Sequence, residues 1–244
     1  MYKYSLLLLL LLTGTVLLAQ DAEQYKEPSK ESQAYHEYRL KDVSNLYHQK
    51  KVIDIVNKIK SDQDGNSKID AKTYQSFSLR EKFTYHLVNP ESYNQNCDVP
   101  LPIQDEHKKI FGHLIDDYGE YSWSDRQIKF FVGNRDSVIK FVKEYTEKDK
   151  HMGVELKHVL VAINAKELIP YLIQTYNIDK KDHDILTVLM LLMRDNQYPP
   201  FMESQSYKKL YGDEYNYGNF LVFNSANEAL IIQRATDFYN GHNK

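Results

Sequence analysis

An internal repeat in the middle of the chain constrains the fold more than any other feature of the sequence. Three units follow one another with a period of about 29 residues, and each unit consists of an apolar stretch, a polar turn and a second apolar stretch. One pair of helices cannot bury its apolar side alone, whereas three stacked pairs can. The first stretches of the units are 110–114, 138–142 and 168–172, and the second stretches are 128–132, 156–160 and 185–189.

The repeat predicts an all-α fold in which antiparallel helical hairpins stack as a short α-solenoid-like array. We expect three αα-hairpin units, and therefore six helices, within residues 106–194. The segment Glu167–Ile173, with Pro170, resembles the first helix of a HEAT repeat, in which a proline often kinks the helix. The alternative is coincidence, because the apolar stripes of any two amphipathic helices can be aligned by sliding. The apolar residues expected to be buried are Ile139, Val142, Leu156, Val159, Leu160, Leu168, Leu172, Val188 and Leu189.

The N-terminus has the pattern of an export signal. Lys3 supplies a positive charge before the mostly apolar stretch Ser5–Ala19, which is shorter than the roughly 20 residues needed to span a bilayer. We therefore predict a signal peptide over residues 1–19, cleaved before Gln20, and an extracytoplasmic location, periplasmic or secreted. An uncleaved anchor is the alternative. No other apolar stretch is long enough to span, so we expect no transmembrane segment in the mature chain.

Two segments lie between the export signal and the repeat. Residues 20–37 are charged and polar without apolar periodicity, which predicts a polar tether. Residues 38–105 are expected to form a helical segment followed by a loop that contains prolines. Its amphipathic helices are expected within 40–59 and over 72–87, and Pro90 is expected to end the last of them.

The C-terminal segment, residues 195–244, begins with a loop rich in tyrosine and ends with a predicted helix. The apolar run 220–223 is expected to be a short strand or a segment tucked against the helices. Ser225 and Glu228 have the spacing of a capping box, so they predict the start of a helix that caps the repeat and ends at Gly241. The residues expected on the buried face of this helix are Ile231, Ala235 and Phe238.

A polar loop between two predicted helices, residues 62–73, resembles an EF-hand calcium loop. Calcium needs six to eight hard oxygen ligands, which alternate residues of a tight turn can supply. Ser67 replaces the usual glycine and Thr73 replaces the bidentate glutamate, so we predict weak Ca²⁺ binding. The alternative is an interhelical turn rich in Asp, Asn and Gly for backbone reasons. The predicted ligands are Asp62, Asp64, Asn66, the main-chain carbonyl of Lys68, Asp70 and Thr73.

Other chemical signals are weak. The 31 basic and 34 acidic residues give a net charge of −3, which does not indicate a nucleic-acid partner. Cys97 is the single cysteine, so an intrachain disulfide is excluded and a silent thiol is expected. His113 and Asp117 share one helix face in the predicted register and are interpreted as a surface pair, whereas 182–184 is interpreted as a helix cap. The sequence has no zincin motif, nucleophile elbow or P-loop.

These features favour a non-enzymatic function. The leading hypothesis is an exported helical binding or scaffold protein with a protein, peptide or glycan ligand. The alternatives are an exported hydrolase whose site assembles from distant residues, and a domain stabilised by calcium. Tyrosines in the C-terminal loop either form a platform for a sugar or peptide or pack the loop onto the helices. These tyrosines are Tyr207, Tyr211, Tyr215 and Tyr217.

Overall fold

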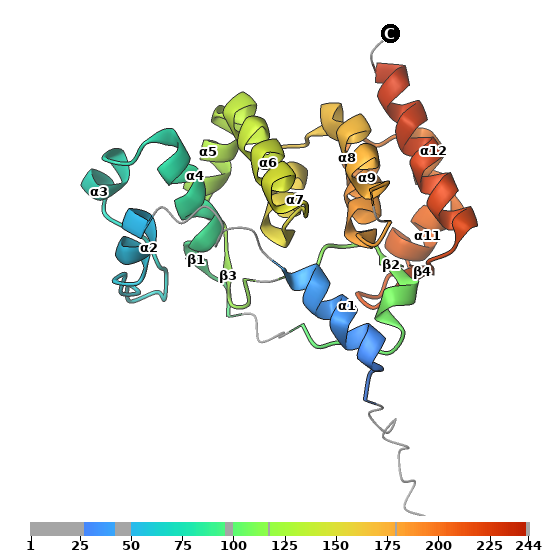
Figure 1. Ribbon diagram of the computed structural model, residues 1–244, viewed down its shortest axis with the longest axis horizontal. Helices are drawn as coiled ribbons and strands as arrows, with labels where there is room; N and C mark the ends of the chain where they lie inside the picture. Colours follow the sequence, from blue (N-terminus) through green and yellow to red (C-terminus); the bar gives the residue numbers. More distant parts are fainter. Residues whose placement is uncertain (1–26, 42–49, 96–99, 117, 179, 243–244) are drawn as a thin grey trace, which may run out of the picture.

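Helices form most of the structure, a computed structural model that describes residues 27–41, 50–95, 100–116, 118–178 and 180–242 (Figure 1). The α-helices are α1 (Lys30–Leu40), α2 (Lys50–Val56), α3 (Ala71–Gln75), α4 (Leu79–Val88), α5 (Asp125–Gly133), α6 (Arg135–Asp149), α7 (Val154–Ala162), α8 (Ile169–Tyr176), α9 (His183–Asp195), α10 (Pro199–Met202), α11 (Gln205–Tyr211) and α12 (Ser225–His242). Two 3₁₀ helices, η2 (Glu106–Lys108) and η3 (Lys166–Leu168), and the strands β1 (Ser92–Tyr93), β2 (Lys109–Phe111), β3 (Tyr121–Ser122) and β4 (Phe220–Val222) complete the described elements.

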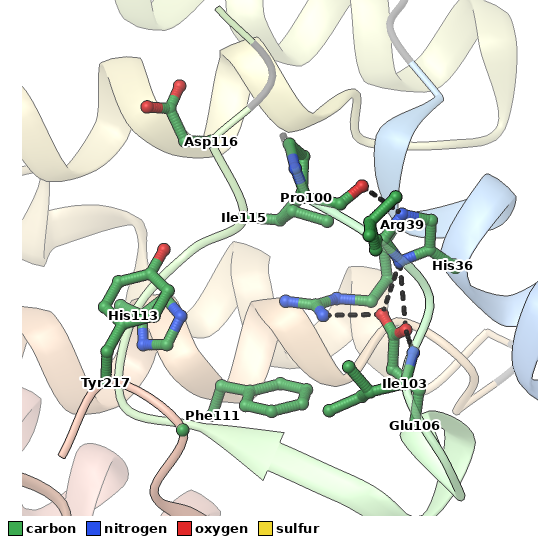
Figure 2. Close-up of a pocket in the computed structure, with 12 residues that line it drawn as sticks. His36, Arg39, Pro100, Ile103, Glu106, Phe111, His113, Ile115, Asp116 and Tyr217 are labelled. Carbon is green, nitrogen blue, oxygen red and sulfur yellow. Dashed lines mark hydrogen bonds and ion pairs between the residues drawn. The ribbon is translucent and has the colours of Figure 1, made fainter. Parts of the chain in front are cut away.

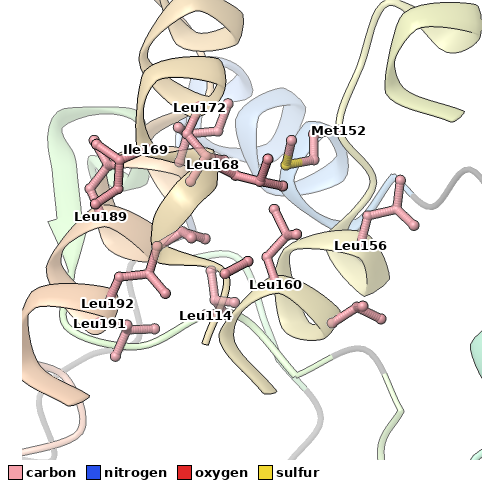
Figure 3. Close-up of a cluster of buried hydrophobic side chains, with 14 of the residues drawn as sticks. Leu114, Met152, Leu156, Leu160, Leu168, Ile169, Leu172, Leu189, Leu191 and Leu192 are labelled. Atoms are coloured by element: carbon pink, nitrogen blue, oxygen red, sulfur yellow. The ribbon is translucent and has the colours of Figure 1, made fainter. Parts of the chain in front are cut away.

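The main core lies among the helices α5 to α9 and α12. Helix α7 packs between α5 and α9, and α8 packs against both α9 and α12. Figure 3 shows leucines of α7, α8 and α9 pointing toward one another, including Leu156, Leu160, Leu172 and Leu189. Each of these four side chains is fully buried, which stabilises the fold by about 1.5–3 kcal/mol per side chain. Helix α12 covers the end of this row (Figure 1).

The burial predicted from the repeat is confirmed for the second and third units. Eight of the nine residues are buried, and Ile139 is partly buried against the same cluster. On α12, the predicted residues Ile231, Ala235 and Phe238 are also buried. The helix is capped one residue earlier than expected. The side-chain oxygen of Asn224, not that of Ser225, accepts a hydrogen bond from the main-chain N–H of Asn227 at 2.9 Å.

The prediction of a helix at the start of the first unit is wrong. Residues Lys109–Phe111 form strand β2, which pairs antiparallel with β4. Gly112 follows the strand, and a Cβ there would lie 3.2 Å from side-chain atoms of Leu210 and Tyr211, so the backbone runs close against α11. The apolar run is too short for its period to separate strand from helix, and pairing with β4 decides the outcome. Five α-helices, α5 to α9, therefore occupy the region where six were expected.

The N-terminal segment also differs from expectation. The single helix predicted over 72–87 is two helices, α3 and α4, because Ser78 and Glu81 form a reciprocal capping box that starts a new helix. A second, smaller hydrophobic core lies in this N-terminal segment and contains Val52, Ile69, Phe77 and Tyr85.

The predicted tether over 20–37 is wrong for its last residues, since α1 begins at Lys30. The Ser29 hydroxyl caps this helix by accepting a hydrogen bond from the main-chain N–H of Ser32. The three buried residues of α1 are Ser32, His36 and Arg39, all polar. A helix that docks through polar side chains has no apolar stripe, which explains why the sequence pattern did not indicate it. The predicted signal peptide, residues 1–19, lies outside the described residues.

The tyrosine-rich segment contains two short helices, α10 and α11, where a loop was expected. The Ser204 hydroxyl caps α11 by accepting a hydrogen bond from the main-chain N–H of Tyr207. Across the described residues, no helix combines the length and the apolar character that a membrane crossing requires.

Candidate functional site

An open cavity of about 560 Å³ is lined by four segments that are distant in the sequence. Its walls come from α1, from the loop and 3₁₀ turn at 100–106, from β2 and the residues after it, and from the loop before β4 (Figure 2). This volume is within the range of small-ligand sites in proteins. The lining residues are His36, Arg39, Pro100, Leu101, Ile103, Glu106, Phe111, His113, Ile115, Asp116, Tyr217 and Gly218.

A buried charge network forms one wall of the cavity. The Arg39 guanidinium donates one hydrogen bond to Glu106 Oε1 at 2.8 Å and two to the carboxylate of Asp184, each at 2.9 Å. All three side chains are at least 95% buried. Burial alone would raise the pKa values of both acids, but hydrogen bonds from His36 and Arg39 lower that of Glu106, and the charges of Arg39 and Lys157 lower that of Asp184.

His36 extends this network. Its Nδ1 lies 2.9 Å from Glu106 Oε2, and its Nε2 lies 3.1 Å from the carbonyl oxygen of Pro100. Both partners accept hydrogen bonds, so each contact uses a proton on the ring nitrogen that makes it. The carboxylates of Glu106 and Asp184 are therefore both engaged by side chains of α1, Glu106 by His36 and Arg39 and Asp184 by Arg39.

The opposite wall is aromatic and uncharged. The His113 ring stacks on Tyr217 with centroids 3.7 Å apart, and Figure 2 shows the pair across the cavity from Arg39. Burial, with a smaller effect from the positive charge of Arg39, lowers the pKa of His113 to about 4, so the ring is neutral at pH 7. Its Nδ1 is buried and has no hydrogen-bond partner among the described residues. Phe111 lies between the walls, with the Arg39 guanidinium 4.6 Å from its ring centroid.

The cavity therefore offers both kinds of hydrogen-bonding group to a ligand. Arg39 has five N–H groups, of which three donate to Glu106 and Asp184, and the other two have no partner among the described residues. The His113 ring supplies one unpaired buried nitrogen. Asp116 also lines the cavity, but its Oδ1 accepts a hydrogen bond from the main-chain N–H of Tyr118 at 3.0 Å, and its carboxylate points away from the other labelled residues (Figure 2). The remaining lining is mainly apolar.

Comparison with known protein families, curated proteins and solved structures found no match. The functional argument for this chain consequently depends on its own geometry.

The predicted calcium ligands make hydrogen bonds within their own loop and to neighbouring segments. Asp62 accepts hydrogen bonds from the main-chain N–H groups of Asp64 and Asn66, and the side-chain amide oxygen of Asn66 accepts one from the main-chain N–H of Tyr93. Asp70 caps α3 by accepting from the main-chain N–H of Thr73. No group of three or more His, Cys, Asp or Glu residues gathers around a metal-sized site in the described part of the chain. Calcium binding stays a prediction.

The other residues singled out from the sequence have mixed outcomes. The interpretation of 182–184 as a cap is wrong, since Asp182 makes no side-chain cap on α9 and instead lies 2.8 Å from the Nζ of buried Lys157. Asp184 joins the charge network, and His113 lies in the loop after β2 rather than on a helix. Asp117 and Cys97 lie outside the described residues.

The four tyrosines of the C-terminal segment were expected either to pack on the helices or to form a ligand platform, and the structure shows some in each position. Tyr207 and Tyr211 pack on the main core, whereas Tyr215 and Tyr217 are exposed, and Tyr217 reaches the cavity. Sequence reasoning missed His36, Arg39 and Glu106. A signal was present, because His36 and Arg39 are three residues apart and so share one face of any helix that contains both.

Proposed function

We propose that this protein is a binding module whose ligand is a peptide segment that places an apolar side chain in the cavity. The observation that carries the proposal is the cavity itself, with mainly apolar walls and a charge network in which Glu106 and Asp184 are already paired with Arg39. A charged ligand group would find no free partner in this network, and burying a charge without a partner is costly, so the site favours an uncharged group.

The polar groups of the cavity fit a peptide unit. A peptide bond presents one carbonyl acceptor and one N–H donor. The spare N–H groups of Arg39 suit the carbonyl, and the unpaired nitrogen of neutral His113 suits the N–H in the tautomer that leaves its lone pair free. Side chains of Leu101, Ile103 and Phe111 provide apolar surface beside them.

The hydrolase alternative has less support. None of the described residues that line the cavity is Ser, Thr, Cys or Lys, so among them there is no hydroxyl or thiol nucleophile of the Ser–His or Cys–His kind. The Glu106 carboxylate accepts from both His36 and Arg39, so it has no free position from which to activate a water.

Two finer proposals accompany the binding function. The succession of α5, α7 and α9, each packed on the next, supports a solenoid-like arrangement of the second and third units. Residues 1–19 support export of the chain through a signal peptide.

The binding test uses defined probes, N-acetyl-leucinamide and N-acetyl-phenylalaninamide, titrated into the protein at pH 7.5 and followed by two-dimensional NMR. We expect saturable shifts at His113, Ile115 and Tyr217. The variant Tyr217→Ala should lose them, whereas the matched control Tyr215→Ala, an exposed tyrosine of the same loop that does not line the cavity, should keep them. His113→Phe keeps an aromatic ring but removes the acceptor, so affinity should fall about fivefold, the worth of one neutral hydrogen bond of about 1 kcal/mol.

A parallel titration with maltose and N-acetylglucosamine separates the ligand classes. Binding of a sugar without binding of either amide would show that the ligand is a glycan and the peptide proposal is wrong. Equal affinity of Tyr217→Ala and Tyr215→Ala for the amides would show that the cavity is not the binding site.

A further inference from the structure

Helix α1 is attached to the rest of the protein in an unusual way. Its three buried residues are polar, whereas the buried face of a neighbouring helix such as α9 is mainly apolar. Apart from Arg39 and its ion pairs, α1 makes two ring contacts: Tyr35 packs at a tilt against His183 with centroids 5.0 Å apart, and Tyr38 meets His151 edge to face with centroids 4.7 Å apart. A helix held by such contacts depends on the charge state of its partners.

Four histidines lie at this interface. His36 is on α1, and His107 lies 3.2 Å from the Ser32 hydroxyl through its Nδ1. His151 and His183 lie under the two tyrosine rings, and the main-chain N–H of His183 donates to the Tyr35 hydroxyl at 3.2 Å. The chain has nine histidines, and four of them lie on or against this one helix. Histidine is the side chain whose ordinary pKa lies between pH 5 and 8, so a helix that packs on such rings is a candidate for control by pH.

We propose that α1 is a latch that acid releases: when the pH falls from about 7.5 to about 5, α1 leaves the body of the protein and takes one wall of the cavity with it. His36 and Arg39 belong to that wall, so release would also abolish ligand binding. This second consequence rests on the proposed function, whereas the release itself does not.

The direction follows from the charge states. Burial lowers the pKa values of His151 and His183 to about 4, so both rings are neutral while α1 is docked. A histidine exposed to water titrates near 6.5, and therefore protons bind more tightly to the undocked state between about pH 6.5 and 4. Acid also protonates Glu106 and Asp184 at still lower pH, which removes the partners of Arg39. The contacts of His36 with Glu106 and with the carbonyl oxygen of Pro100 hold α1 in place and oppose release.

The surroundings of α1 contain charges of both signs. Lys157 adds to the lowering at His151, whereas Asp149 opposes it, and Asp184 opposes the lowering at His183. His183 also stacks on Phe223 with centroids 3.7 Å apart, and its Nδ1 lies 3.1 Å from the carbonyl oxygen of Lys109, so undocking of α1 exposes this ring only in part. Full exposure of the His151 ring weakens docking by up to about 30-fold at pH 5, and partial exposure of His183 adds to this effect. The titratable and charged groups that face the interface are Tyr35, Tyr38 and Lys41 on α1, Glu106, His107 and Lys108 on η2, Asp149, His151 and Lys157 on α6, α7 and the link between them, Asp182, His183 and Asp184 at the start of α9, and Glu228 on α12.

Hydrogen–deuterium exchange of the full chain tests the latch at pH 7.5 and 5, with rates corrected to protection factors. We expect protection of the 30–40 amides to fall by more than tenfold at pH 5, while amides of α8 and α9 keep theirs. Retained protection of α1 at pH 5 would overturn the proposal. Loss of protection in α1, α8 and α9 together would overturn it as well, because that result is global unfolding.

Variants identify the groups responsible. The double variant His151→Gln, His183→Gln has no titrating rings under α1, so its protection should change less than threefold between the two pH values. His86→Gln is the matched control, since His86 is also buried with a pKa lowered to about 3 but lies in the N-terminal segment, away from α1. The wild-type comparison of α1 with α8 and α9 decides the proposal even if a variant fails to fold.

Titration of N-acetyl-leucinamide at both pH values separates the two proposals. Release of α1 at pH 5 without amide binding at pH 7.5 would retain the latch and refute the proposed function. Amide binding at pH 7.5 that persists at pH 5 with α1 protected would refute the latch alone.

Discussion

Removal of Arg39 should destabilise the protein far more than removal of a similar arginine on the surface. In Arg39→Ala, the carboxylates of Glu106 and Asp184 lose their shared cation while they remain almost fully buried. Breaking a buried ion pair on one side costs about 3–5 kcal/mol, since the remaining charge is left without a partner. We expect a loss in that range in the free energy of unfolding at pH 7.5.

The matched control is Arg80→Ala. Arg80 also makes a two-point contact with one carboxylate, that of Glu144, at 3.0 and 2.9 Å, but these side chains are 34% and 45% exposed. Exposed pairs contribute about 0.2–1 kcal/mol, so the control should lose little from its ion pair. Arg39 is buried and holds two carboxylates, whereas Arg80 is partly exposed and holds one, so the comparison measures the cost of leaving buried acids without their cation.

Urea unfolding followed by circular dichroism measures both variants. A triple variant that combines Arg39→Met, Glu106→Gln and Asp184→Asn removes the two anions together with the cation. It should be less destabilised than Arg39→Ala. The pKa values of both acids are lowered in the folded protein, so the stability they contribute is present above their ordinary values near 4 and is lost as the pH falls below them. The difference between wild type and Arg39→Ala should therefore disappear in strong acid. Equal losses for Arg39→Ala and Arg80→Ala at pH 7.5 would refute the reasoning.

Three further measurements test the core, the polar loop and the N-terminus. Leu172→Ala should cost about 2–5 kcal/mol in urea unfolding, as truncation of a fully buried leucine does, whereas Ile178→Ala, at a side chain 75% exposed, should cost little. If the 62–73 loop binds calcium with a dissociation constant of about 10⁻⁴–10⁻³ M, millimolar calcium should raise the melting temperature by a few degrees. Asp62→Ala should abolish this shift, and Thr73→Glu should enlarge it. Identical melting temperatures with calcium and with chelator, for both wild type and Thr73→Glu, would show that the loop is only a turn. Sequencing of the exported protein should begin at or near Gln20, and retention of the initiator methionine in a membrane fraction would contradict cleavage.

The apolar helices of the repeat could be predicted because their information is local. Leu156 and Leu160 on α7, and Val188 and Leu189 on α9, recur at helical spacing and are buried as expected. Transfer of an apolar side chain out of water is favourable whatever its neighbours are, so a pattern of apolar residues predicts burial without knowledge of the partner. The same reasoning failed at Ile110, where a short run became a strand because β4 lies beside it.

Polar docking carries no such local signal. Nothing in the sequence around Arg39 indicates that its partners are Glu106 and Asp184, which follow it by 67 and 145 residues. A charged side chain is stable either in water or in a buried pair, and only the position of the partner decides between them.

The sequence by itself therefore determined that the central region is helical and which of its leucines and valines form the core. The tertiary structure alone decided that α1 docks through charges, that β2 meets β4, and that a cavity forms where His36, Arg39, Glu106, His113 and Tyr217 come together. The physical reason is that apolar burial depends on the identity of each residue, whereas an ion pair, a strand pair and a cavity each depend on the placement of groups far apart in the chain.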